Sequence, residues 1–105
     1  MKNINKRRDT LIHILYTSTD DTARNSSILE LSGFDDTKVL NVLHVCASDP
    51  KEQPDIQLAC GEAIAEIMIR NESLNMKFVD GLSAIALKAF KAFVKEREKE
   101  WLKEI

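Results

Sequence analysis

The chain has 105 residues, of which 44% are hydrophobic and 30% are charged, and its formal net charge is −2. This length is that of one domain, and the composition is that of a globular protein rather than a disordered one. No segment is apolar for long enough to span a bilayer. Only three glycines and two prolines are present, which favours helices joined by short loops.

Apolar periodicity predicts helices over about 10–16, 20–31 and 36–47 in the first half of the chain. Asp9 is expected to cap the first of these helices and Asp35 the third, because a carboxylate before a helix accepts bonds from its free N–H groups. We expect the basic residues before the first helix to form a tail, residues 1–8.

The stretch "PDIQLACGEAIAEIMIR" predicts a helix over 54–70, with Pro54 in its first turn. Its apolar residues form two stripes, while Asp55, Glu62 and Glu66 fall on the remaining side. A short turn is expected over 74–79.

A last helix is predicted over about 82–103, and residues 97–105 are its charged end. Alternating Val, Ile or Thr runs typical of strands are absent, so the sequence predicts an all-α domain of five to six helices. A helix that is apolar on two sides favours a stack of antiparallel helical hairpins, and an irregular helical bundle is the alternative.

A repeat with an offset of 36 residues relates residues 20–31 to residues 55–67. Three pairs match: Ile28 with Ile64, Glu30 with Glu66, and Leu31 with Ile67. The run "GEAIAEI" resembles the second helix of a HEAT-like repeat, and residues 35–50 resemble its first helix. The resemblance implies a short stack of hairpins, with residues 75–100 as an irregular third copy.

Charge is unevenly distributed, with +3 on residues 1–19, −7 on residues 20–66 and +2 on residues 67–105. An acidic middle suits a basic partner, although a solvated helical face is the simpler explanation. Small size, this charge layout and the lack of a recognisable catalytic group resemble the immunity proteins of contact-dependent growth inhibition systems. That resemblance implies a cytoplasmic inhibitor that binds one toxin domain, often a basic nuclease.

The candidate partner-binding surface is formed by the carboxylates of the acidic middle. Its residues are Asp20, Asp21, Asp35, Asp36, Asp55, Glu62 and Glu66. They are expected to attract a basic domain and pair with its Lys or Arg groups. The alternatives are a nucleic-acid-binding module that uses the basic termini and a generic adaptor module. Glu residues that interleave with the bases of the last helix weaken the nucleic-acid alternative. The oligomeric state stays open.

No catalytic, metal or cofactor site is predicted. His13 and His44 lie on separate predicted helices, and no familiar nucleotide-binding, protease or hydrolase motif occurs. Cys46 and Cys60 fall in apolar stripes, so we expect buried free thiols, which fit a reducing cytoplasm. The sequence therefore predicts a non-enzymatic protein.

Overall fold

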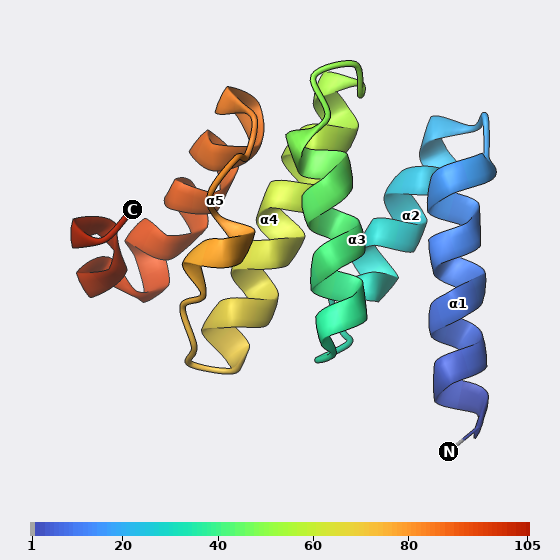
Figure 1. Cartoon of the computed structure of the whole chain (residues 1–105), viewed down its shortest axis with the longest axis horizontal. Helices are drawn as coiled ribbons and strands as arrows, with labels where there is room; N and C mark the ends of the chain where they lie inside the picture. The colour runs from blue at the N-terminus through green and yellow to red at the C-terminus, as the bar shows by residue number, and fades with distance from the viewer. Residues whose placement is uncertain (1) are drawn as a thin grey trace.

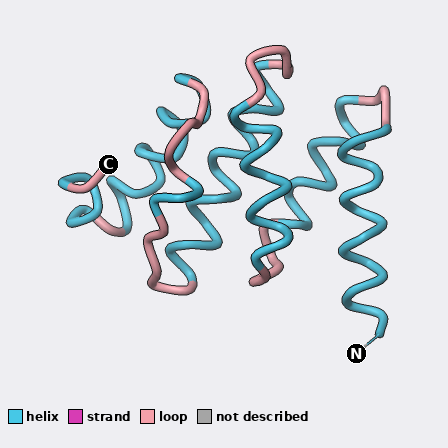
Figure 2. Tube along the Cα trace, viewed as in Figure 1, coloured by secondary structure: helices cyan, strands magenta, loops and turns pink. Residues whose placement is uncertain are grey.

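The computed structural model describes the backbone of residues 2–105 and the side chains of residues 5–105. Over this range the chain is helical and contains no strand (Figure 2). The elements are α1 (Lys2–Thr17), α2 (Asp21–Leu31), α3 (Thr37–Ser48), α4 (Pro54–Arg70), the 3₁₀ turn η1 (Met76–Phe78), α5 (Ala84–Arg97) and the 3₁₀ segment η2 (Lys99–Lys103). The predicted all-α class with five helices is confirmed. No helix within residues 2–105 is long and apolar enough to cross a membrane.

The helices form two layers. In one layer α4 packs between α2 and α5, and in the other α3 lies between α1 and η1 (Figure 1). The pairs α1/α2 and α3/α4 are antiparallel hairpins that join the layers. The turn η1 takes the place of a first helix in a third, shortened hairpin. The arrangement is a short stack of hairpins, and kinship with HEAT repeats stays a prediction.

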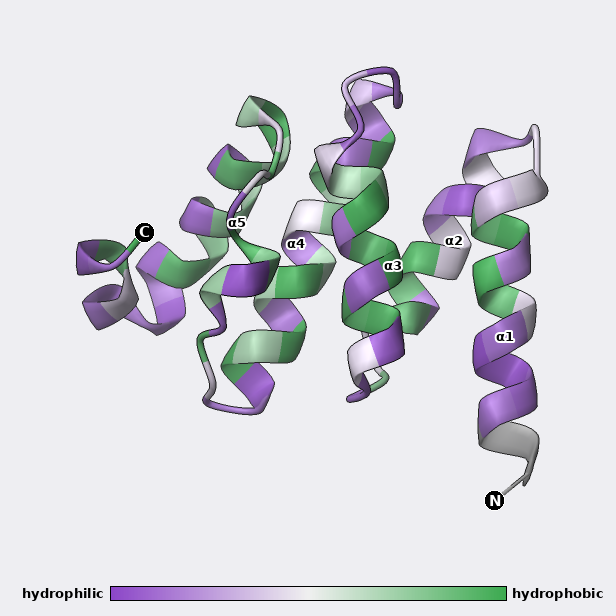
Figure 3. Ribbon diagram, in the orientation of Figure 1, coloured by the Kyte–Doolittle hydropathy of each residue, from purple (hydrophilic) through white to green (hydrophobic). Residues whose placement is uncertain are grey.

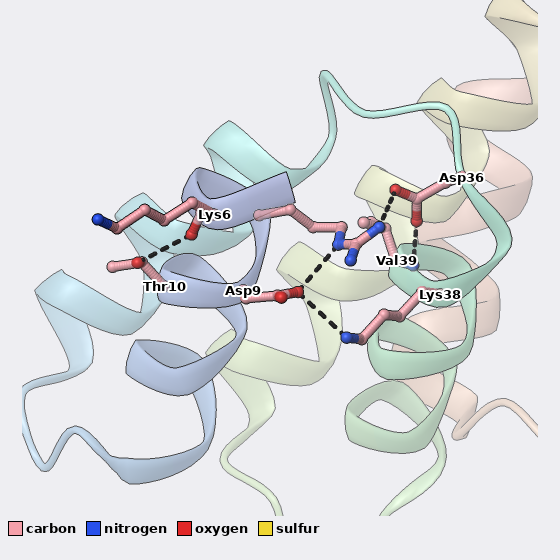
Figure 4. A network of polar contacts seen from close by, with 7 residues as sticks. Lys6, Asp9, Thr10, Asp36, Lys38 and Val39 are labelled. Atoms are coloured by element: carbon pink, nitrogen blue, oxygen red, sulfur yellow. Dashed lines mark hydrogen bonds and ion pairs between the residues drawn. The ribbon is translucent and has the colours of Figure 1, made fainter. Parts of the chain in front are cut away.

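The predicted start of the first helix is wrong, because α1 begins at Lys2 rather than near residue 10, so the basic residues expected to form a tail belong to this helix. Asp9 lies inside α1 and caps nothing. Its carboxylate instead accepts bonds from Arg8 at 3.0 Å and from Lys38 of α3 at 3.1 Å (Figure 4). Arg8 also donates to Asp36 at 3.1 Å. These polar contacts hold a helix half that has no apolar stripe.

The last helix is also shorter than predicted. Ser83 caps α5 by accepting a bond from the Ala86 N–H at 3.1 Å, and the helix stops at Arg97. Glu98 leaves the helical conformation (φ −141°, ψ 67°), so η2 turns back. Trp101, with other apolar residues of this end, then packs against the core rather than projecting into solvent.

The core is centred on α4, as its two apolar stripes predict. Ile64 and Ile67 have no exposed surface, and hydrophobic residues are concentrated on α3 and α4 (Figure 3). Gly61 packs against the backbone of Ala86 so closely that a Cβ on Gly61 would lie 2.9 Å from the Ala86 Cα. This absence of a side chain lets α5 approach α4.

Candidate interaction groove

An open groove lies across the layer formed by α2, α4 and α5. It consists of a hollow of about 280 Å³ and a neighbouring hollow of about 220 Å³, which share Glu62 and Phe93. The residues that line the groove are Asn25, Ile28, Leu29 and Ser32 of α2, Ala59, Glu62, Ala63 and Glu66 of α4, and Ala92, Phe93, Glu96 and Arg97 of α5.

The shape of the groove follows from small residues on the middle helix. Ala59 and Ala63 are one turn apart on α4, so they lie on the same face of this helix. Larger side chains of the neighbouring helices line the two sides, Leu29 from α2 and Phe93 from α5. Leu29 is 74% exposed, the highest value among the large hydrophobic residues that are exposed. Its exposed side chain makes the groove apolar.

Two carboxylates stand in this apolar setting. Glu62 and Glu66 are one turn apart on α4 and are partly buried. Among the side chains of residues 5–105, neither carboxylate has a hydrogen-bond or ion-pair partner. Like charges at this spacing repel each other by roughly 0.2–0.5 kcal/mol. The groove therefore presents two carboxylates that no ion pair among these side chains neutralises.

The basic residue that is closest to Glu66 in the sequence bonds to other groups. Arg70 follows Glu66 by one turn, but its guanidinium donates to Asp35 at 2.9 Å and to the Ser32 carbonyl at 2.8 Å. This bonding lowers the pKa of the Asp35 carboxyl from its ordinary value. At the α5 end, Arg97 lies over the Phe93 ring at 5.2 Å from its centroid. The groove is thus lined by three carboxylates, those of Glu62, Glu66 and Glu96, and by one guanidinium.

The structure does not bring the seven predicted carboxylates into one surface. Glu62 and Glu66 lie in the groove. Asp20, Asp21 and Asp55 lie where α2 and α4 begin, at the same end of the stack (Figure 1). The remaining two, Asp35 and Asp36, lie at the opposite end, in the loop that leads into α3.

Several of these aspartates also have structural roles. Asp20 caps α2 by accepting a bond from the Thr22 N–H at 3.0 Å, and Asp36 caps α3 by accepting one from the Val39 N–H at 2.8 Å (Figure 4). The cap of α3 is thus Asp36 rather than the predicted Asp35, which bonds to Arg70. Only the glutamates combine negative charge with an apolar hollow.

Sequence reasoning missed the apolar part of the groove. Phe93 belongs to the apolar stripe of α5, which predicts a core position, yet it is only partly buried. Leu29 lies between the buried residues Ile28 and Leu31 and off their stripe. That displacement was a usable signal, because a leucine off the core stripe of a short helix is exposed unless another element covers it.

Two of the basic N-terminal residues, Arg7 and Arg8, are paired with acids from other elements. Arg7 donates to Glu30 of α2 at 2.6 Å, and Arg8 donates to Asp36 before α3. Binding of nucleic acid phosphates there would have to break these pairs. This pairing disfavours the nucleic-acid alternative.

The histidines and cysteines have structural surroundings. His13 is exposed, whereas the Nε2 of His44 lies 2.7 Å from the Asp80 carbonyl oxygen, as expected for a donor N–H. Cys46 and Cys60 are buried free thiols, as predicted. Contact with Cys46 and burial raise the pKa of the Cys60 thiol, which keeps it protonated. Across the side chains described, no three His, Cys, Asp or Glu residues are grouped to hold a metal ion.

Comparison with known proteins finds no family model, curated protein or solved structure that matches the chain.

Proposed function

We propose that this chain is a non-enzymatic protein-binding module that binds a basic partner in the groove of α2, α4 and α5. In its most specific form, the proposal is that the chain is an immunity protein that neutralises a toxin, such as a basic nuclease domain. The observation that carries it is the pair Glu62 and Glu66, which lack ionic partners beside an apolar hollow.

The two kinds of groove residue have different roles in binding. Burial of Leu29 and Phe93 against a partner would contribute to affinity. The removal of apolar surface from water is favourable by roughly 25 cal/mol per Å². Cations of the partner would relieve the repulsion between Glu62 and Glu66. A nuclease presents such cations where it binds phosphates, so occupation of the groove would also block its substrate.

The acidic residues outside the groove would act at longer range. Asp20, Asp21 and Asp55 lie together at one end of the stack. Charges of one sign near a binding surface raise the association rate of an oppositely charged protein, and salt screens this effect. They would therefore affect the association rate more than the dissociation rate.

The test is titration of a toxin domain encoded next to the gene for this chain. Inhibition of the toxin should level off at a fixed molar ratio, and cells that express the toxin should survive only when they also express this chain. Turnover at substoichiometric amounts would overturn the non-enzymatic proposal. A gene neighbourhood with no toxin would overturn the immunity form.

Charge reversal tests the groove itself. The double variant E62K/E66K should slow association at low salt by at least about tenfold, because it replaces attraction with repulsion. The matched control is E72K/E104K, which makes the same change in net charge at exposed positions outside the groove. Equal association rates for the two variants would show that overall charge, rather than the groove, attracts the partner.

A further inference from the structure

We propose that the part of the partner that enters the groove is a basic amphipathic α-helix. This inference rests on the proposed protein-binding function and names the element that the groove recognises. The helix would lie along α4, place one large apolar side chain between Leu29 and Phe93, and hold Lys or Arg residues one turn apart against Glu62 and Glu66.

The spacing of the carboxylates favours a helix. Residues one turn apart on a helix have Cβ atoms about 5–6 Å apart, so cations one turn apart on a second helix match Glu62 and Glu66. In an extended strand, side chains on the same face are about 6.6–6.8 Å apart. An extended segment would place its cations roughly 1 Å farther apart than a helix does, so it matches the two carboxylates less well.

The shape of the groove favours the same occupant. Its middle helix carries Ala59 and Ala63, whose small side chains permit close approach, and larger side chains line both sides. Such a trough between helices is the form in which amphipathic helices bind, with anchors repeated at helical spacing. The main hollow of about 280 Å³ has room for an anchoring side chain but not for a whole helix.

The negative charge of the groove indicates which residues should flank the apolar anchor of the partner helix. The carboxylates of Glu62, Glu66 and Glu96 outnumber the one guanidinium, and Arg97 is held over Phe93. A neutral or acidic helix would leave the glutamates partly desolvated without a counter-charge, which is unfavourable. Lys or Arg on both sides of the apolar anchor would provide it.

The experiment uses the isotope-labelled full chain and a designed peptide of about five turns. The peptide carries a leucine anchor flanked by lysines one turn apart on the same face. A second peptide has the same composition, but its order places the leucine and the lysines on opposite faces. Chemical-shift changes in the chain locate the binding site, and circular dichroism reports whether the peptide becomes helical.

The ordered peptide should become helical and shift the resonances of groove residues, and it should bind at least about tenfold more tightly than the reordered peptide. L29N removes an exposed apolar side of the groove without changing charge and should weaken binding by a similar factor. E62Q/E66Q should weaken it and reduce its salt dependence. Each variant is checked for an unchanged melting temperature, so that lost binding is not lost folding.

Two outcomes would overturn the proposal that a helix occupies the groove. One is equal affinity for both peptides, which would mean that charge alone drives binding. The other is the absence of shifts in the groove. If the peptide fails while toxin inhibition is still saturable and is lost in E62K/E66K, the proposed function stands and only the helical occupant is wrong. If the inhibition also fails, the function itself is wrong.

Discussion

The guanidinium of Arg24 on α2 binds both carboxylate oxygens of Glu52, in the loop between α3 and α4, at 2.8 and 2.7 Å. The two side chains are only 12% and 13% exposed. Arg24 also donates to the Leu15 carbonyl of α1 at 2.8 Å. One side chain therefore joins the first hairpin to the second.

Removal of the negative charge of Glu52 should destabilise the fold. E52Q would leave the guanidinium of Arg24 mostly buried without its counter-charge, and we expect the free energy of unfolding to fall by about 3 kcal/mol. Urea denaturation measures this change. The control is E30Q, which removes the exposed pair with Arg7 and should cost less than about 1 kcal/mol. Equal losses would show that burial does not strengthen the Arg24–Glu52 pair.

The same pair should make the fold sensitive to acid. The hydrogen bonds from Arg24 lower the pKa of the Glu52 carboxyl below its ordinary value of about 4.5. A carboxyl with a lowered folded-state pKa stabilises the fold above its unfolded-state pKa, and this stabilisation is lost as pH falls through the folded-state value. At pH values below about 4.5, the melting temperature should therefore decrease as the pH is lowered. This decrease should be shallower in E52Q than in the unsubstituted protein. Parallel declines in both proteins would contradict this assignment.

The close approach of α4 and α5 predicts an unusual cost for adding one methyl group. G61A would bring a Cβ against the backbone of Ala86, which cannot move aside as a flexible side chain can. We expect a net loss of about 1–3 kcal/mol, although alanine is the better helix former. In the control G33A, the new Cβ would lie 3.4 Å from the Glu30 carbonyl oxygen, and stability should change much less. A stable G61A would show that the two helices are less tightly apposed.

Groove binding and stability should respond in opposite directions at Glu66. E66Q removes the repulsion from Glu62 and should raise the free energy of unfolding by roughly 0.2–0.5 kcal/mol. It should also weaken binding of the basic partner. D55N should instead lower the free energy of unfolding by about 0.3–1 kcal/mol, because the carboxylate of Asp55 interacts favourably with the positive N-terminal end of the α4 dipole. It should have little effect on the affinity of the groove. Calorimetry of the same samples measures both quantities.

The helical periodicity of the sequence was sufficient to predict most of the fold. The two apolar stripes around Ile64 indicated a helix covered on both sides, and α4 is such a helix. The first half of α1 was not predictable in this way, because it has no apolar stripe and is held by Glu30 and Asp36 from later parts of the chain. The break at Glu98 was missed because charged residues suit a helix, whereas packing of Trp101 on the core needs a turn.

For the candidate site, the sequence predicted charge better than shape. It assigned Glu62 and Glu66 to the acidic side of a helix, which is where they lie. It could not show that Arg70, one turn after Glu66, is held by Asp35. Nor could it bring Leu29 and Phe93 to the same groove, since that depends on the packing of α2 and α5 on α4.

The two halves of α1 are attached to the molecule by different forces. Leu11 and Leu15 are buried, whereas residues 5–10 are mostly exposed and are held largely by ion pairs. Salt screens exposed ion pairs but leaves apolar contacts in place. Backbone amide protons in the first half should therefore exchange with solvent faster as salt is added, while those near Leu15 stay protected. Ionic strength thus sets how much of α1 remains helical at any moment.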